Sequence, residues 1–137
     1  SNADEQRWAV MNTDRPEHDA VSERIIGCAF TVANTLGSGF LEKVYENALA
    51  LELRTAGFTV EQQKPIGVIY KGALVGEYFA DLLVDGATMI ELKTVRALDG
   101  AHRAQCINYL RATGKRLCLL INFGRPRIEI QRIADDP

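Results

Sequence analysis

Residues 78–93 read YFADLLVDGATMIELK, and this stretch determines how the middle of the chain folds. Two apolar runs, typical of buried strands, flank Asp85-Gly86, which is a common hairpin signal. Asp81 interrupts the first run, whereas Glu91 and Lys93 interrupt the second. Because residues two apart in a strand point to the same face, Glu91 and Lys93 are expected side by side. A two-residue turn would leave Asp81 one position from Glu91, so a small slip or a bulge would place these two residues together.

Three charged groups in a largely buried sheet require partners, because burying isolated charges costs several kcal/mol each. A cross-strand ion pair of Lys93 with Asp81 or Glu91 is one interpretation. The other is that Asp81 and Glu91 bind Mg²⁺ or Mn²⁺, because hard cations prefer oxygen ligands. The backbone carbonyl of Leu92 can add a third ligand. Lys93 would then orient the attacking water and offset the charge on a phosphate in the transition state.

The remaining pattern predicts a single α/β domain. Apolar residues recur at helical spacing over about 17–36 and 40–56, and glycines follow both segments. Strands are expected over 58–64, 66–70, 74–84, 88–95, 116–122 and 127–133, with a helix over 101–112. Pro65 is expected to separate the first two strands. The predicted order is therefore α-α-β-β-β-β-α-β-β, a central mixed sheet flanked by helices, with a parallel strand pair within residues 88–122.

Chain length suits one domain, since the sequence has 137 residues. Residues 1–17 are polar and lack periodicity, so a disordered N-terminal arm is expected there and a folded domain over 18–134. Ser1-Asn2-Ala3 resembles a remnant of tag cleavage. The three cysteines are widely spaced and form no CxxC pair, which predicts reduced thiols in place of a disulfide framework or zinc cluster. They are Cys28, Cys106 and Cys118.

Location and partners are constrained weakly by composition. No apolar run approaches the roughly 20 residues of a membrane span, and no secretory pattern opens the chain. A cytoplasmic protein without a membrane partner is therefore expected. Charge is uneven, since residues 1–92 carry a net charge of -7 and residues 93–137 carry +5, which gives the overall -2. The basic C-terminal third predicts either phosphate contacts or an ordinary solvated surface.

The order of the charged residues resembles the core of the PD-(D/E)XK nuclease superfamily, with Asp81 followed by Glu91-Leu92-Lys93. Upstream, GFLEKVY at residues 39–45 is similar to the signature of the GxxExxY family, a branch of that superfamily. Downstream, Gln105 and Tyr109 resemble the Gln-x-x-x-Tyr pattern that follows the catalytic strands of RecB-like nucleases. The motifs also follow one another in the order found in the superfamily.

This resemblance extends over residues 18–133 and implies a restriction-endonuclease-like fold. It also implies a nuclease that hydrolyses phosphodiester bonds with Mg²⁺ or Mn²⁺, with DNA favoured over RNA as the substrate. One departure is Ala80, which stands where the superfamily name has proline. Proline there is a backbone preference and performs no chemistry, so the site is expected to be intact.

The resemblance adds Glu42 to the expected metal ligands, either directly or through water. A simpler role also exists, because a carboxylate in the first turn of a helix interacts favourably with the helix dipole. Glu46 lies one turn further on the same side. We expect it to be a solvated surface residue, with a supporting role at the site as the alternative, and we expect Tyr45 in the core.

On the later helix, the resemblance adds Gln105 to Asp81, Glu91 and Lys93 as a predicted catalytic residue. His102, Gln105 and Tyr109 are spaced to share one helix face. His102 and Tyr109 are predicted to contact the substrate from this face, with ordinary helix surface for His102 and ordinary core for Tyr109 as the alternatives. Arg103, a basic residue of the C-terminal third, is also predicted to contact the substrate.

Two other functions remain open. A module that binds nucleic acid without cutting it could use the basic residues of the C-terminal third for phosphate contacts. These are Arg103, Arg111, Lys115, Arg116, Arg125 and Arg127. A partner-binding subunit of a larger assembly is the other alternative, and a homodimer could form through the edge strand expected at 127–133.

Overall fold

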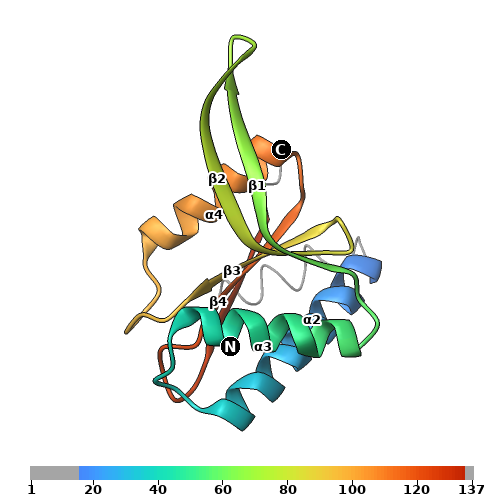
Figure 1. The fold of residues 1–137 in the computed structure, drawn as a ribbon, viewed down its shortest axis with the longest axis vertical. Helices are drawn as coiled ribbons and strands as arrows, with labels where there is room; N and C mark the ends of the chain where they lie inside the picture. Colours follow the sequence, from blue (N-terminus) through green and yellow to red (C-terminus); the bar gives the residue numbers. More distant parts are fainter. Residues whose placement is uncertain (1–15, 135–137) are drawn as a thin grey trace.

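The computed structural model describes residues 16–134. Two helices, α2 (Pro16–Leu36) and α3 (Glu42–Thr55), precede a five-stranded sheet, and α4 (Gly100–Thr113) lies between its third and fourth strands in the chain (Figure 1). The strands are β1 (Val60–Tyr70), β2 (Ala73–Val84), β3 (Thr88–Lys93), β4 (Leu117–Asn122) and β5 (Glu129–Ala134). Only residues 16 and 17 of the predicted N-terminal arm fall within the described chain, where they begin α2.

The sheet has the spatial order β1-β2-β3-β4-β5. Neighbouring strands are antiparallel except β3 and β4, which are parallel. The predicted mixed sheet and its parallel pair are therefore confirmed, with α4 as the crossover. β5 lies at one edge of the sheet, as expected from its sequence. Among the described residues, no helix is both long and apolar enough to cross a bilayer.

The predicted strand break at Pro65 is wrong. Pro65 lies inside β1, opposite Phe79 of β2, so the two strands expected over 58–64 and 66–70 form one. β1 is the other edge of the sheet, and an edge strand tolerates proline because its missing N–H leaves no neighbour unpaired. Residues 16–134 accordingly contain one strand fewer than the sequence predicted.

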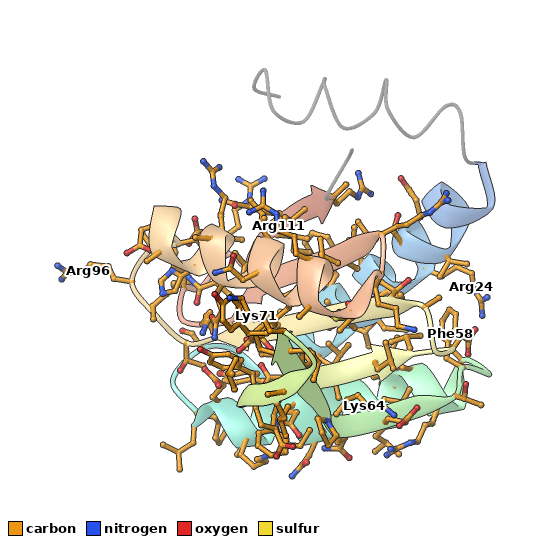
Figure 2. All side chains as sticks on the ribbon, turned by 90° about the horizontal axis from the view of Figure 1, so that it is seen from above. Arg24, Phe58, Lys64, Lys71, Arg96 and Arg111 are labelled. Atoms are coloured by element: carbon orange, nitrogen blue, oxygen red, sulfur yellow. The ribbon has the colours of Figure 1, made fainter. Side chains whose placement is uncertain are left out.

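Each face of the sheet is covered by helices. One face packs against α2 and α3, and the other packs against α4 (Figure 2). All six residues of β4 are buried, which explains its uninterrupted apolar sequence. The three cysteines are free, as predicted.

The β1–β2 hairpin projects beyond the body of the molecule (Figure 1). Its outer part exposes large apolar side chains, although most of the sheet's apolar residues are buried. The exposed residues are Ile69, Tyr70, Leu74, Val75, Tyr78 and Phe79.

The segment that leaves β3 is held against the segment that leaves β4. The buried Asn122 side chain accepts a hydrogen bond from Val95 N at 3.0 Å and donates to Val95 O at 2.9 Å. Phe123 N also donates to Lys93 O at 2.8 Å. Gly124 follows, and a Cβ there would lie 2.5 Å from Val95 N. These contacts determine the course of the chain between Lys93 and α4.

Candidate active site

The site forms where the β2–β3 ladder stops. Regular pairing ends at Leu82 opposite Ile90, so Asp81 and Glu91 are the next residues along the two strands. The connecting turn contains the three residues Asp85, Gly86 and Ala87, because Val84 pairs with Thr88. The extra turn residue supplies the one-residue offset that a two-residue turn would have lacked.

Beyond that point, β2 and β3 are joined by hydrogen bonds between side chains and backbone. Leu92 N donates to Asp81 Oδ2 at 2.8 Å, and Asp81 N donates to Glu91 Oε1 at 3.2 Å. Each carboxylate is therefore held by the backbone of the opposite strand. Lys93 Nζ lies 3.9 Å from Glu91 Oε2, which confirms that these two side chains share a face. Their side-chain exposures differ, at 20% for Lys93 and 4% for Glu91, so the ammonium group reaches toward solvent.

The carboxylates of the site repel one another. Burial, followed by the charge of Asp81, raises the pKa of Glu91 to about 8. Burial also raises the pKa of Asp81, although hydrogen bonds from Leu92 and Gln63 oppose this change. Lys93 lowers the pKa of both groups, but burial and the neighbouring carboxylates outweigh its effect.

Glu42 lies at the start of α3, on the rim of this cluster. It is exposed, yet burial of its carboxyl group and then the charge of Asp81 raise its pKa. Tyr45 orients this helix end, since its hydroxyl donates to Gly37 O at 2.6 Å and accepts from Phe40 N at 3.2 Å. Tyr45 is buried and stacks on Phe123, which confirms its predicted core position.

Glu46 is not the solvated surface residue that we expected. It is 3% exposed and accepts hydrogen bonds from Lys43, Gln62 and Gln63. Gln63 also donates to Asp81 Oδ1 at 3.0 Å and so belongs to the site, although the sequence interpretation missed it. The available signal was the pair of adjacent glutamines, Gln62 and Gln63, in β1.

Two predicted residues of α4 contact each other beside the carboxylates. Gln105 Nε2 donates to Tyr109 Oη at 2.7 Å. Burial, followed by the charge of Glu91, raises the pKa of Tyr109 to about 12, so its phenol stays protonated at neutral pH. The ring of Tyr78 lies 5.7 Å from that of Tyr109 and joins the projecting hairpin to α4.

The other two predicted residues of α4 have structural contacts of their own. His102 Nδ1 accepts from Asp99 N at 3.1 Å, while Asp99 Oδ1 accepts from His102 N, so His102 completes a capping box. Arg103 is exposed one residue later on the helix. A substrate contact by either residue stays a prediction.

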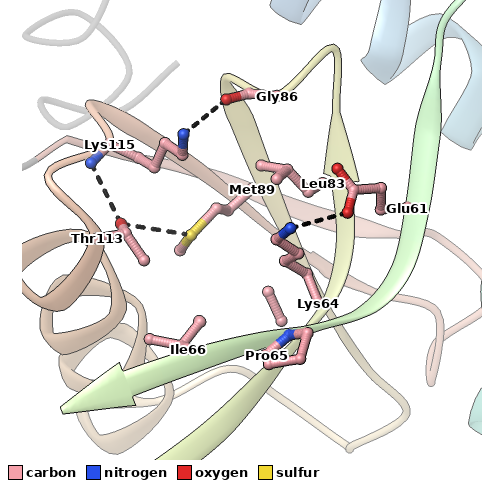
Figure 3. A pocket seen from close by; sticks show the side chains of 10 residues that line it. Glu61, Lys64, Pro65, Ile66, Leu83, Gly86, Met89, Thr113 and Lys115 are labelled. Carbon is pink, nitrogen blue, oxygen red and sulfur yellow. Dashed lines mark hydrogen bonds and ion pairs between the residues drawn. The ribbon is translucent and has the colours of Figure 1, made fainter.

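A separate pocket of about 210 Å³ lies between β1, the β2–β3 turn and the C-terminal end of α4 (Figure 3). Its two lysines already have partners, since Lys64 pairs with Glu61 at 2.9 Å and Lys115 donates to Gly86 O at 2.7 Å. Asp81, Glu91 and Lys93 do not line it. The pocket is therefore distinct from the carboxylate cluster.

Metal binding was predicted at Asp81, Glu91, Glu42 and the Leu92 carbonyl. Within residues 16–134, no group of three or more His, Cys, Asp and Glu side chains is gathered in a ready-made metal cage. The structure does join Asp81 and Glu91, but it leaves Glu42 at the rim. The donor set is two carboxyl groups, which provide the hard oxygen ligands that a divalent cation takes.

Without added metal, stability is expected to depend on the protonation of Glu91. Its pKa of about 8 in the folded chain lies above the ordinary 4.5, so the folded state retains a proton that the unfolded chain loses. The free energy of unfolding should therefore decrease as pH rises from about 4.5 to about 8. Glu91→Gln, which can still accept the Asp81 N–H, should make the profile flatter and gain stability over wild type at high pH. Denaturant titrations across this range, with chelator present, test the expectation; equal slopes for both proteins would contradict it.

Comparison with known proteins identifies the family. The sequence profile of the PD-(D/E)XK nuclease superfamily matches residues 19–133. The chain belongs to this superfamily, whose members are nucleases that act on nucleic acid and generally use divalent metal ions. No curated protein matches the sequence significantly.

Two solved structures are similar to the chain. The crystal structure of SSO0001 has a TM-score of 0.52 and 21% sequence identity, and the match covers 69% of this chain and 50% of that chain. The chain thus spans half the length of that protein. The alkaline exonuclease LHK-Exo from Laribacter hongkongensis gives a TM-score of 0.44 and 16% identity, with 79% and 76% of the two chains covered. The first likeness, with the family match, confirms the predicted restriction-endonuclease-like α/β domain.

Proposed function

We propose that this chain is a metal-dependent nuclease of the GxxExxY branch. It would cleave DNA phosphodiester bonds with Asp81, Glu91 and Lys93 as the catalytic residues. The observation that supports this proposal best is the interlocked pair of Asp81 and Glu91, each held by the backbone of the opposite strand. The catalytic domain would comprise residues 18–134. A cytoplasmic location accompanies the proposal.

Asp81 and Glu91 would hold the cation, Mg²⁺ or Mn²⁺, together with the Leu92 carbonyl. Glu42, at the rim, would complete the ligand set directly or through water. A divalent cation at this position supplies Lewis-acid stabilisation of phosphate charge and lowers the pKa of a water molecule. Its charge would also oppose the burial and the carboxylate repulsion that together raise the pKa of all three carboxyl groups.

The remaining groups would act on the substrate. Lys93, partly exposed beside Glu91, would orient the attacking water and offset negative charge that develops on the phosphate. Gln105, fixed by its hydrogen bond with Tyr109, would position the scissile group. His102, Arg103 and Tyr109 would contact the nucleic acid along α4. Figure 2 shows Arg111 on the same helix and Arg96 in the segment before it, both projecting outward, where they could contact phosphates.

Metal binding to Asp81→Ala tests this proposal. Calorimetric titration with Mn²⁺ at neutral pH should show binding to the wild type and at least about tenfold weaker binding to the variant, because one of two carboxylate ligands is lost. Glu77→Ala is the matched control, since Glu77 is an exposed carboxylate of the same strand. Cleavage of single- and double-stranded DNA and of RNA should then be measured with Mg²⁺ and with Mn²⁺.

The outcomes separate the alternatives. Metal-dependent cleavage that is lost in Asp81→Ala supports the nuclease. Salt-sensitive DNA binding that Asp81→Ala leaves unchanged, without cleavage by the wild type, would favour a non-catalytic binding module. Activity that requires a homodimer would be detected by measuring cleavage across a range of protein concentrations, whereas activity that requires another chain would appear only when that chain is added.

A further inference from the structure

Gln63 lies between two carboxylates from different elements. Its Nε2 atom donates to Glu46 Oε1 of α3 at 2.7 Å and to Asp81 Oδ1 of β2 at 3.0 Å. A side-chain amide nitrogen carries two hydrogens, so both are used. The second oxygen of Asp81 accepts from Leu92 N at 2.8 Å. Each oxygen of Asp81 therefore has its own donor, and the orientation of the carboxylate is determined from both sides.

The backbone of β1 is distorted at this residue. Gln63 has φ of 53°, a left-handed conformation that residues with a Cβ adopt rarely. Its neighbours Gln62 and Lys64 keep regular pairing with Leu82 and Ala80, so the distortion is confined to the position opposite Asp81. Within the described strands, no other residue has a positive φ. The left-handed backbone therefore occurs at the residue whose side chain contacts both Glu46 and Asp81.

Glu46 provides a fixed attachment for this contact. It is buried on α3, and besides Gln63 it accepts from Lys43 Nζ at 2.9 Å and from Gln62 Nε2 at 2.8 Å. A carboxylate with three donors and little exposure has few alternative orientations. The Glu46–Gln63–Asp81 bridge thus connects the site to the rigid helix that also carries Glu42.

We propose that Gln63 is a positioning residue that fixes the orientation of Asp81 through Glu46. The inference rests on the proposed function, because Asp81 is the residue whose orientation the reaction would use. A purely structural role, in which Gln63 serves only as a hydrogen-bond donor for buried Glu46, makes a different prediction. It predicts that loss of the amide affects stability and leaves metal binding unchanged.

Gln63→Asn separates these roles. Asparagine tolerates the left-handed backbone but is one methylene shorter, so it cannot span Glu46 and Asp81. We expect Mn²⁺ affinity and cleavage rate to fall about 10–100-fold, the range found when groups that orient metal ligands are removed. The unfolding midpoint should stay close to that of the wild type. Gln62→Asn is the matched control, because Gln62 also donates to Glu46 but has no hydrogen bond with Asp81.

Several outcomes would refute the positioning role of Gln63. Metal affinity and rate equal to wild type in Gln63→Asn would do so, as would equal losses in Gln63→Asn and Gln62→Asn. If Gln63→Asn does not fold, Gln63→Gly removes the amide and accepts the same backbone conformation. A crystal structure of the metal-free variant gives a readout independent of the proposed function. It should show Asp81 in more than one orientation, and a single wild-type orientation would refute the positioning role even if the wild type neither binds Mn²⁺ nor cuts.

Discussion

Lys93→Met is expected to lower the cleavage rate about 10²–10³-fold while the fold is retained. The Lys93 side chain is 20% exposed beside the buried Glu91, where its ammonium group can reach a phosphate. Removal of one group that stabilises transition-state charge typically costs this much in kcat. Methionine is unbranched and only one atom shorter, and it removes the ammonium group with its charge and its hydrogen-bond donors. Single-turnover cleavage at saturating metal, with circular dichroism to verify folding, measures the effect.

A matched lysine distinguishes this role from a general loss of positive charge. Lys64→Met changes the net charge equally, but Lys64 lies in a surface ion pair with Glu61, and such pairs contribute little to stability. We expect its cleavage rate to stay within a few-fold of wild type. Mn²⁺ affinity should not fall in Lys93→Met, because Lys93 is a cation close to the proposed ligands. A cleavage rate that is insensitive to Lys93→Met would remove this residue from the proposed mechanism.

Gly124→Ala is expected to reduce the free energy of unfolding by about 2–3 kcal/mol, a typical cost of overpacking a well-packed region. The new Cβ would lie 2.5 Å from Val95 N and 2.6 Å from the carbonyl carbon of Thr94. Both neighbours are backbone, so neither can rotate away. Gly124 has no positive φ, and the cost is therefore steric. Urea denaturation measures the change.

Gly27→Ala is the control for this substitution. Gly27 lies in α2, and a Cβ there meets no atom within 4 Å. Because alanine is a better helix former than glycine by roughly 1 kcal/mol, this variant should be as stable as wild type or more stable. If the two variants lose equal stability, the close approach of the segments after β3 and β4 does not explain the requirement for glycine at position 124.

The sequence predicted much of the fold because its strongest signals are local. Asp85-Gly86 between two apolar runs predicted the β2–β3 hairpin, and helical spacing predicted α2 and α3. The prediction of a strand break at Pro65 was wrong because the effect of a proline depends on whether its strand is central or at an edge. That position is a property of the assembled sheet. The order of Asp81, Glu91 and Lys93 had suggested the PD-(D/E)XK nuclease superfamily, and the family match confirmed that the chain belongs to it.

The candidate site was predictable only in part, because some of its contacts depend on how distant segments pack together. Spacing placed Glu91 beside Lys93, and the hairpin brought Asp81 near them. Glu46 and Gln63 are 17 residues apart and meet only because α3 packs beside β1. The periodicity of a sequence cannot predict a contact between distant elements, so Glu46 resembled an ordinary surface residue of a helix.

The parallel pairing of β3 with β4 has a consequence for the order of folding. Asp81 and Glu91 belong to a local hairpin, whereas Gln105 and Tyr109 take their places only when β4 pairs beside β3 and α4 closes the crossover. Contacts between distant parts of a chain generally form later than local ones, because more conformational entropy is lost in closing the longer loop. A partly synthesised or partly unfolded chain would therefore have the carboxylate pair without the helix proposed to position the substrate. Completion of the sheet would then act as the step that makes the chain competent to cut nucleic acid.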